Sequence, residues 1–106
     1  MVLLSIDEYC KEILIIVANN QNIGFFHGNN LESGDYEQRN ICILPEYQGM
    51  GIGSTILRGI IDAHKNQDIY LRCFKQNPVV KLYKKLGFKI YEETEHHYKM
   101  CLKRKK

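Results

Sequence analysis

The segment Gln48-Gly49-Met50-Gly51-Ile52-Gly53-Ser54 carries three glycines at alternate positions and leads into an amphipathic stretch. From residue 51 to residue 64 the apolar side chains recur at helical spacing, and residues 36–44 before the segment are predicted as a strand that Pro45 ends. A helix that starts in bare backbone points its free amides, and the positive end of its dipole, away from the chain. The segment therefore predicts an anion-binding loop that joins a strand to a helix.

Two common phosphate-binding motifs do not fit this spacing. A dinucleotide-binding fingerprint requires glycine at its first, third and sixth positions, but the third residue after Gly51 is Ser54. A Walker A loop requires a lysine before its Ser or Thr, and here Gly53 is followed directly by Ser54. From the residues alone a second interpretation stays open, in which the glycines only tighten the turn between strand and helix.

Working outward, the pattern alternates between strand and helix periods without repeats or linkers. The capping box Ser5-Ile6-Asp7-Glu8 predicts a short helix to about Lys11. Strands are predicted at 13–18, 23–27, 36–44, 68–74, 88–92 and 97–102, with a turn at 19–22 and a loop at 28–35. A second helix starts at Asn77 as N-cap with Pro78 as its first residue, and Gly87 ends it. The order (α)-β-β-β-α-β-α-β-β predicts the α/β (α+β) class, a mixed sheet with helices against it.

Length and composition predict one domain over residues 1–106. The chain is 44% hydrophobic and 25% charged, which is typical of a globular protein. The longest apolar run, 13–18, is far short of the roughly 20 residues of a membrane span. No signal-peptide pattern is visible, and we expect a cytoplasmic location without membrane association.

The charge and the cysteines add two expectations. The net charge of +3 comes from the basic tail Lys103-Arg104-Lys105-Lys106, so the body of the chain is slightly acidic and nucleic-acid binding is not expected. Cys10, Cys42, Cys73 and Cys101 form no CxxC pair. We expect them to be small buried residues rather than metal ligands.

Two segments together resemble the GNAT superfamily of acyl-CoA-dependent N-acyltransferases. Residues 45–53 (PEYQGMGIG) fill its Gln/Arg-x-x-Gly-x-Gly/Ala signature, and residues 77–88 (NPVVKLYKKLGF) are similar to its second signature helix. Residues 93–100 resemble the last hairpin of one subgroup, so that the resemblance covers roughly 13–102. Members usually begin with a strand and two helices, whereas about twelve residues precede the hairpin here. The resemblance thus implies a mostly antiparallel sheet lacking the usual first strand and helix, with an acceptor pocket that is open, completed in a homodimer, or degraded.

The resemblance also implies roles for individual residues. Backbone groups of Cys42, Ile43 and Leu44 would contact the pantetheine arm and polarise the thioester carbonyl. The pyrophosphate would be held by the glycine-rich segment, which consists of Gln48, Gly49, Met50, Gly51, Ile52, Gly53 and Ser54. Asn77 would contact pantetheine or sulfur, or be an N-cap only. Tyr83 would protonate the departing thiolate, or be a core aromatic. Glu37 would be the general base, or an exposed strand carboxylate, and His96 or His97 are alternatives to it.

The function implied is direct transfer of an acetyl group from acetyl-CoA to a primary amine of a small molecule or a protein, without a metal. A CoA-binding module without acceptor-site activity is the alternative. The residues do not identify the acceptor.

Overall fold

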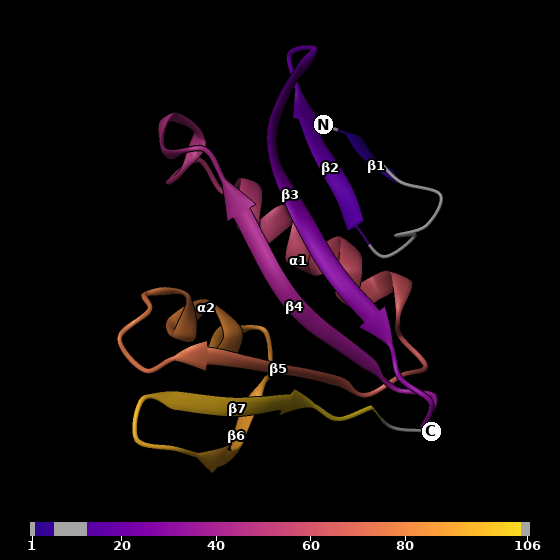
Figure 1. The fold of residues 1–106 in the computed structure, drawn as a ribbon, viewed down its shortest axis with the longest axis vertical. Helices are drawn as coiled ribbons and strands as arrows, with labels where there is room; N and C mark the ends of the chain where they lie inside the picture. Colours follow the sequence, from indigo (N-terminus) through magenta and orange to yellow (C-terminus); the bar gives the residue numbers. More distant parts are fainter. Residues whose placement is uncertain (1, 6–12, 105–106) are drawn as a thin grey trace.

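Within the residues that the computed structural model describes, 2–5 and 13–104, seven strands form one sheet in the order β1-β2-β3-β4-β5-β7-β6 (Figure 1). Neighbouring strands are antiparallel except β4 and β5, which are parallel. The elements are β1 (Val2–Ser5), β2 (Ile13–Ala18), β3 (Gln21–Asn30), β4 (Tyr36–Ile43), a 3₁₀ turn (Pro45–Tyr47), α1 (Ile52–Ala63), β5 (Ile69–Phe74), α2 (Val79–Lys85), β6 (Lys89–Glu93) and β7 (His97–Leu102). The mixed, mostly antiparallel sheet predicted from the sequence is confirmed. So are the two predicted helices that correspond to α1 and α2.

The N-terminal hairpin departs from the prediction at its turn and at its second strand. Asn19 and Asn20 have φ of 52° and 63°, in the left-handed region that asparagine tolerates. These two residues form the whole turn, which is shorter than the predicted turn at 19–22. Strand β3 continues to Asn30 because residues 28–30 pair with residues 36–38 of β4, so the predicted loop at 28–35 is too long.

Strand β1 was not predicted. Residues 2–5 pair antiparallel with β2. The short helix predicted from Ser5 to about Lys11 falls on residues 6–12, which lie outside the described part of the chain.

Both helices pack against the same face of the sheet and share one hydrophobic core with it. Helix α1 buries Ile56, Leu57 and Ile60, and α2 buries Val80 and Tyr83. The sheet side chains buried in this core are Ile16, Ile23, Phe26, Tyr36, Ile69, Leu71, Cys73 and Met100. Since alternate side chains of a strand point to opposite faces, the neighbours of these residues lie on the face opposite the helices.

Strands β4 and β5 separate after a short paired segment, and this separation positions the site. They pair only from Tyr36↔Ile69 to Gln38↔Leu71, after which β4 and β5 diverge (Figure 1). At the same point β4 has a bulge against β3, since His27 pairs with Asn40 and Gly28 with Gln38. The extra residue, Arg39, bends the strand and reverses its alternation.

The cysteines differ in burial. Cys73 and Cys101 are buried, as predicted, but Cys42 is exposed, so the prediction is wrong for Cys42. Its position on β4, beyond the bulge, places it on the face away from the core. Cys10 lies outside the described residues. None of the helices in the described part of the chain has the length and hydropathy of a membrane span.

Candidate active site

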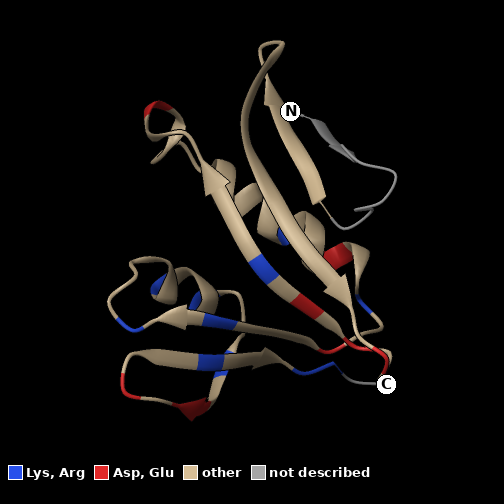
Figure 2. Cartoon of the chain, viewed as in Figure 1, with Lys and Arg blue, Asp and Glu red and all other residues tan. Residues whose placement is uncertain are grey.

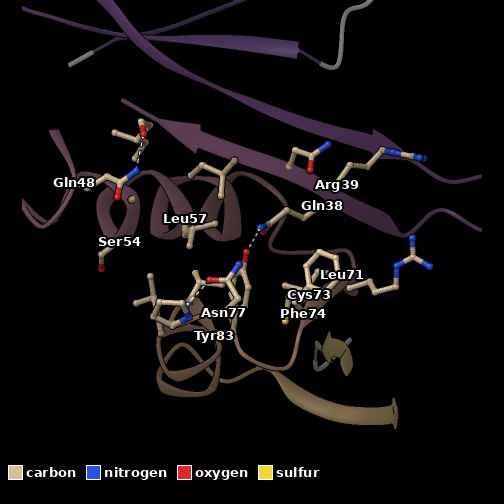
Figure 3. A pocket seen from close by; sticks show the side chains of 18 of the residues that line it. Gln38, Arg39, Gln48, Ser54, Leu57, Leu71, Cys73, Phe74, Asn77 and Tyr83 are labelled. Atoms are coloured by element: carbon tan, nitrogen blue, oxygen red, sulfur yellow. Dashed lines mark hydrogen bonds between the residues drawn. The ribbon is translucent and has the colours of Figure 1, made fainter. Parts of the chain in front are cut away.

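A cavity of about 1130 Å³ fills the gap between β4 and β5 (Figure 3). Its wall comes from β4, the glycine-rich loop with the first turn of α1, β5, α2, and side chains of β6 and β7. Ten of the residues predicted for the site line it: Glu37, Ile43, Gln48, Gly49, Gly51, Ile52, Gly53, Ser54, Asn77 and Tyr83. Three others, Cys42, Leu44 and Met50, are not part of the lining.

The backbone of Ile43 faces the gap. The amide of Leu44 donates to the Ile23 carbonyl of β3 at 2.8 Å, and amide direction alternates along a strand. The amide of Ile43 therefore points away from β3, while that of Cys42 points toward it. The carbonyl of Ile43, which belongs to the next peptide group, accepts a 2.9 Å hydrogen bond from Gln48 Nε2. Of the three residues predicted to offer backbone groups, Cys42, Ile43 and Leu44, Ile43 is the one whose amide is directed into the gap.

The glycine-rich loop leaves the first amides of α1 open. Gly49 and Gly51 have φ of 79° and 78°, a region that favours glycine, and Gly51 is the N-cap without a side-chain cap. Thr55 is the first helix residue whose amide has an acceptor in the loop: it donates to the Gly51 carbonyl at 3.0 Å. The three amides before it, from Ile52 to Ser54, have no intrahelical acceptor, and the first turn carries no acidic residue. This geometry suits an anion.

The fold does not require glycine at position 53. A Cβ placed there would meet Ile43 Cδ1 at 3.7 Å, which is ordinary van der Waals contact. The missing side chain at position 53 therefore leaves space for a ligand beside the start of α1.

Tyr83 is held in the cavity wall by a buried amide. Gln38 Nε2 donates to the Tyr83 hydroxyl oxygen at 2.6 Å, and the two residues are 5% and 4% exposed (Figure 3). Burial raises the pKa of the Tyr83 hydroxyl to about 12, although the hydrogen bond from Gln38 acts in the opposite direction. The ring of Phe88 packs against Tyr83 with the centroids 5.5 Å apart.

Gln38 was missed by the sequence analysis. A polar residue next to exposed positions on a strand gives no direct signal that it is buried. The one available signal is that Gln38 lies two residues after Tyr36, so both side chains point to the same face of the sheet.

Asn77 has a structural role that is visible directly. Its Oδ1 accepts a 3.0 Å hydrogen bond from the amide of Val79, the first residue of α2. This is the capping function predicted for it. Asn77 also lines the cavity, where its side-chain nitrogen has no protein partner within the described residues. The two interpretations of Asn77 are therefore compatible.

The mouth of the cavity on the face opposite the helices is charged. Glu37 pairs with Arg39 at 3.1 Å, and Lys99 pairs with Glu92 at 3.0 Å. His97 lines the cavity and lies against Phe74 with the ring centroids 4.3 Å apart. His96 is outside the cavity wall, next to Glu95 at 3.8 Å. His97 is thus better placed than His96 as an alternative base.

Chemically, the gap combines an outward amide, a buried hydroxyl and an anion-binding helix start in one cavity. Nothing in the described ranges forms a group of three or more His, Cys, Asp or Glu side chains that could hold a metal ion.

The sequence and the fold are similar to those of known proteins. The chain is 33% identical over 88 residues to the [ribosomal protein bS18]-alanine N-acetyltransferase of Haemophilus influenzae, with 80% of this chain and 60% of that protein covered. It superposes on the PaiA N-acetyltransferase of Thermoplasma acidophilum in complex with coenzyme A with a TM-score of 0.75 at 26% identity, covering 86% of this chain and 59% of that one. For Arabidopsis thaliana Naa50 in complex with a bisubstrate analogue, the TM-score is 0.69 at 26% identity, with 84% and 70% covered.

The chain thus spans 60% and 59% of the lengths of the first two of these relatives. The sequence model of the acetyltransferase (GNAT) domain matches residues 10–90, most of the chain. The chain belongs to the acetyltransferase (GNAT) domain family.

Proposed function

We propose that the protein transfers an acetyl group from acetyl-CoA to a primary amine by direct attack within a ternary complex. The observation that carries the proposal is the open edge of β4, where the amide of Ile43 faces a cavity that also contains the Tyr83 hydroxyl and the start of α1. The relatives whose names include N-acetyltransferase, and the neighbours solved with coenzyme A or a bisubstrate analogue, support it. We further propose that residues 1–106 form a single domain for this purpose.

The residues present suit acetyl-CoA. The open amides of Ile52, Gly53 and Ser54 would hold its diphosphate, because they combine free donors with the positive end of the helix dipole. The unpaired edge of β4 beyond Arg39 would hydrogen-bond the amide groups of the pantetheine arm, replacing the strand partner that β5 no longer provides. Asn77 would contact the same arm through its free side-chain nitrogen.

Acetyl-CoA supplies the activated acyl group, and the protein stabilises the charges that develop on it. The amide of Ile43 donates to the thioester oxygen as negative charge forms there. The nitrogen–carbon bond forms, the carbon–sulfur bond breaks, and the amine loses one proton while the sulfur leaves as a thiolate. Tyr83 donates its hydroxyl proton toward that sulfur.

The raised pKa of Tyr83 limits how this proton moves. A hydrated thiol has a pKa near 8.5, so complete transfer from a hydroxyl of pKa about 12 would be unfavourable by roughly 5 kcal/mol. Exclusion of water from the same cavity raises the pKa of the thiol as well, which reduces this difference. We infer that Tyr83 first stabilises the thiolate by a hydrogen bond. When the proton then moves from the Tyr83 oxygen to the sulfur, the hydrogen bond from Gln38 stabilises the phenolate that remains.

We propose the α-amine of a protein or peptide as the acceptor, because relatives named as an N-alpha-acetyltransferase and a ribosomal-protein alanine N-acetyltransferase support it. An α-amine has a pKa of about 7.7–8.0, so its deprotonation at pH 7 costs only about 1 kcal/mol, whereas a lysine amine costs over 4 kcal/mol. Glu37, at the open face of the cavity, would accept the proton through water, and His97 is the alternative.

Two measurements on one sample test this proposal against the alternative of a CoA-binding module. Isothermal titration with CoA measures binding, which both functions require. Thiol release from acetyl-CoA in the presence of peptide and small amines measures transfer, which only the enzyme performs. Binding without thiol release for any amine would leave the CoA-binding module as the function.

A further inference from the structure

Three basic side chains form a row across β4, β5 and β7 at the open mouth of the cavity. Arg39 and Arg72 each follow the last pair of the β4–β5 ladder, Gln38↔Leu71, and Arg72 is directly opposite Lys99 in the β5–β7 ladder. All three line the cavity. In Figure 2 basic segments of β4 and β5 lie beside the gap that opens between these strands, and a basic segment of β7 lies next to that of β5.

Burial shows that Arg72 and Lys99 are on the face opposite the helices. The chain neighbours of Arg72, Leu71 and Cys73, are buried in the core, and so is Met100, next to Lys99. Side chains alternate along a strand, so Arg72 and Lys99 project to the other face. Tyr70 lies on the same face as Arg72, and its ring contacts Tyr91 edge to face at a centroid distance of 5.8 Å.

The three cations differ in their partners. Arg39 is neutralised by Glu37 and Lys99 by Glu92. Arg72 is exposed, and across the described ranges its guanidinium has neither an ion pair nor a hydrogen bond. Like charges directly opposite each other on a sheet are destabilising, so the pair Arg72↔Lys99 contributes nothing favourable to the fold.

We propose that Arg72 binds a carboxylate of the acceptor, so that the site selects amines carrying an acidic group close to the reacting nitrogen. This inference rests on the proposed acetyl transfer and adds the chemical class of the acceptor. Arg72 follows the last β4–β5 pair by one residue and lines the same cavity as Ile43, which lies five residues beyond that pair on β4. An acceptor that enters this cavity from the face opposite the helices would pass the Arg72 guanidinium.

A planar guanidinium suits this role because it donates two parallel hydrogen bonds to one carboxylate. The same charge disfavours a protonated amine next to it, which lowers the pKa of the acceptor and repels polyamines. Two sources offer the required chemistry: a peptide N-terminus with Asp or Glu among its first residues, and a free acidic amino acid.

The test compares peptides that differ only in the second residue, Asp, Ser or Lys, together with free L-aspartate. Enzymes are the full chain, Arg72→Gln, Arg72→Lys and the control Arg58→Gln, which removes an exposed arginine of α1 outside the cavity. We expect the full chain to prefer the Asp peptide over the Lys peptide at least about tenfold in kcat/KM, as a charge-assisted bidentate pair would give. Arg72→Gln should abolish this ratio, Arg72→Lys should retain part of it, and Arg58→Gln all of it.

A second measurement tests the preference for the Asp peptide by equilibrium binding, without turnover. N-acetylated product peptides with a C-terminal fluorophore are titrated with each protein in the presence of CoA, and anisotropy gives their affinities. Equal affinity of the full chain for the Asp and Lys products, or a preference unchanged in Arg72→Gln, overturns the role of Arg72. A binding preference that depends on Arg72, with no acetyl transfer to any acceptor, supports the anion site and refutes the proposed transfer. Turnover of L-aspartate above that of the peptides assigns the free amino acid as the source.

Discussion

The side-chain nitrogen of Gln38 lies 2.6 Å from the hydroxyl oxygen of Tyr83, and this hydrogen bond joins β4 to α2 across the wall of the cavity. Because Gln38 donates, the proton of the Tyr83 hydroxyl remains free to point into the cavity. The bond thereby fixes both the position of the oxygen and the direction in which it can donate. A residue with no role in the sequence signatures thus orients the hydroxyl that we assign to the leaving sulfur.

Replacing Gln38 by Leu should lower kcat about tenfold while CoA affinity changes little, because the Tyr83 hydroxyl loses the donor that orients it. In a Tyr83→Phe background the same replacement should have almost no further effect, since the two residues act through one bond. Steady-state kinetics and isothermal titration with CoA check both. Gln67→Leu, which removes an amide that bonds Asn30 away from the cavity, is the matched control. Additive losses in the double variant would contradict a shared role.

Alkaline pH should destabilise the protein through Tyr83. Its pKa is about 12 in the folded chain against an ordinary value of 10, so the unfolded chain ionises first as pH rises and the stability is lost between pH 10 and pH 12. From pH 9 to pH 11 this amounts to ~1.4 kcal/mol of unfolding free energy. Urea denaturation at the two pH values, compared with Tyr83→Phe, measures it. An equal loss in both proteins would show that Tyr83 does not titrate in this way.

Replacing Gly53 by Ala should separate ligand binding from stability. The added methyl meets only Ile43 at an ordinary contact distance, and alanine is the better helix former by roughly 1 kcal/mol, so unfolding should become no easier. The methyl would nevertheless occupy the approach of a diphosphate to the open amides, and we expect CoA affinity to fall at least about tenfold. Gly59→Ala, on the same helix with no atoms near its added carbon, should stabilise equally and leave CoA affinity unchanged. Equal CoA affinity in the two variants would exclude diphosphate binding at Gly53.

Glu37→Gln and His97→Gln distinguish the two candidate bases. If Glu37 accepts the proton through water, Glu37→Gln lowers kcat/KM about 10²-fold near neutral pH, with recovery toward higher pH as the acceptor amine deprotonates by itself. His97→Gln then changes kcat/KM less than threefold. A pH profile of kcat/KM for both variants is the measurement, and the reverse ranking would assign the base to His97.

The sequence predicted the parts of this site that depend on backbone rules. It predicted a glycine-rich turn before α1 and Asn77 as the cap of α2. In the structure Gly49 and Gly51 have positive φ, which glycine adopts readily, and Asn77 Oδ1 accepts from the amide of Val79. The two helices follow from apolar periodicity in the same way. Such features are decided within a few residues of chain, and one sequence is sufficient to predict them.

The remainder depends on contacts between distant segments. The bulge at Arg39 arises where β3 and β4 change register, and it decides that Ile43, and not Cys42 or Leu44, presents its amide to the gap. The burial of Gln38 requires α2 to be in place, and the strand at 2–5 requires β2 as its partner. The two-residue spacing between Tyr36 and Gln38 is the one sequence signal that bears on these features, and it does not identify the partner of Gln38.

The central claim is that acetyl-CoA lies in the gap between β4 and β5, against the edge of β4 and the start of α1. Amide NMR spectra of the ¹⁵N-labelled chain, recorded while acetyl-CoA is added, test this most directly. We expect large shifts for the amides of Ile43, Ile52, Gly53 and Ser54, with much smaller shifts for Gly59. Saturating acetyl-CoA that left the Ile43 and Gly53 amides unmoved would contradict it.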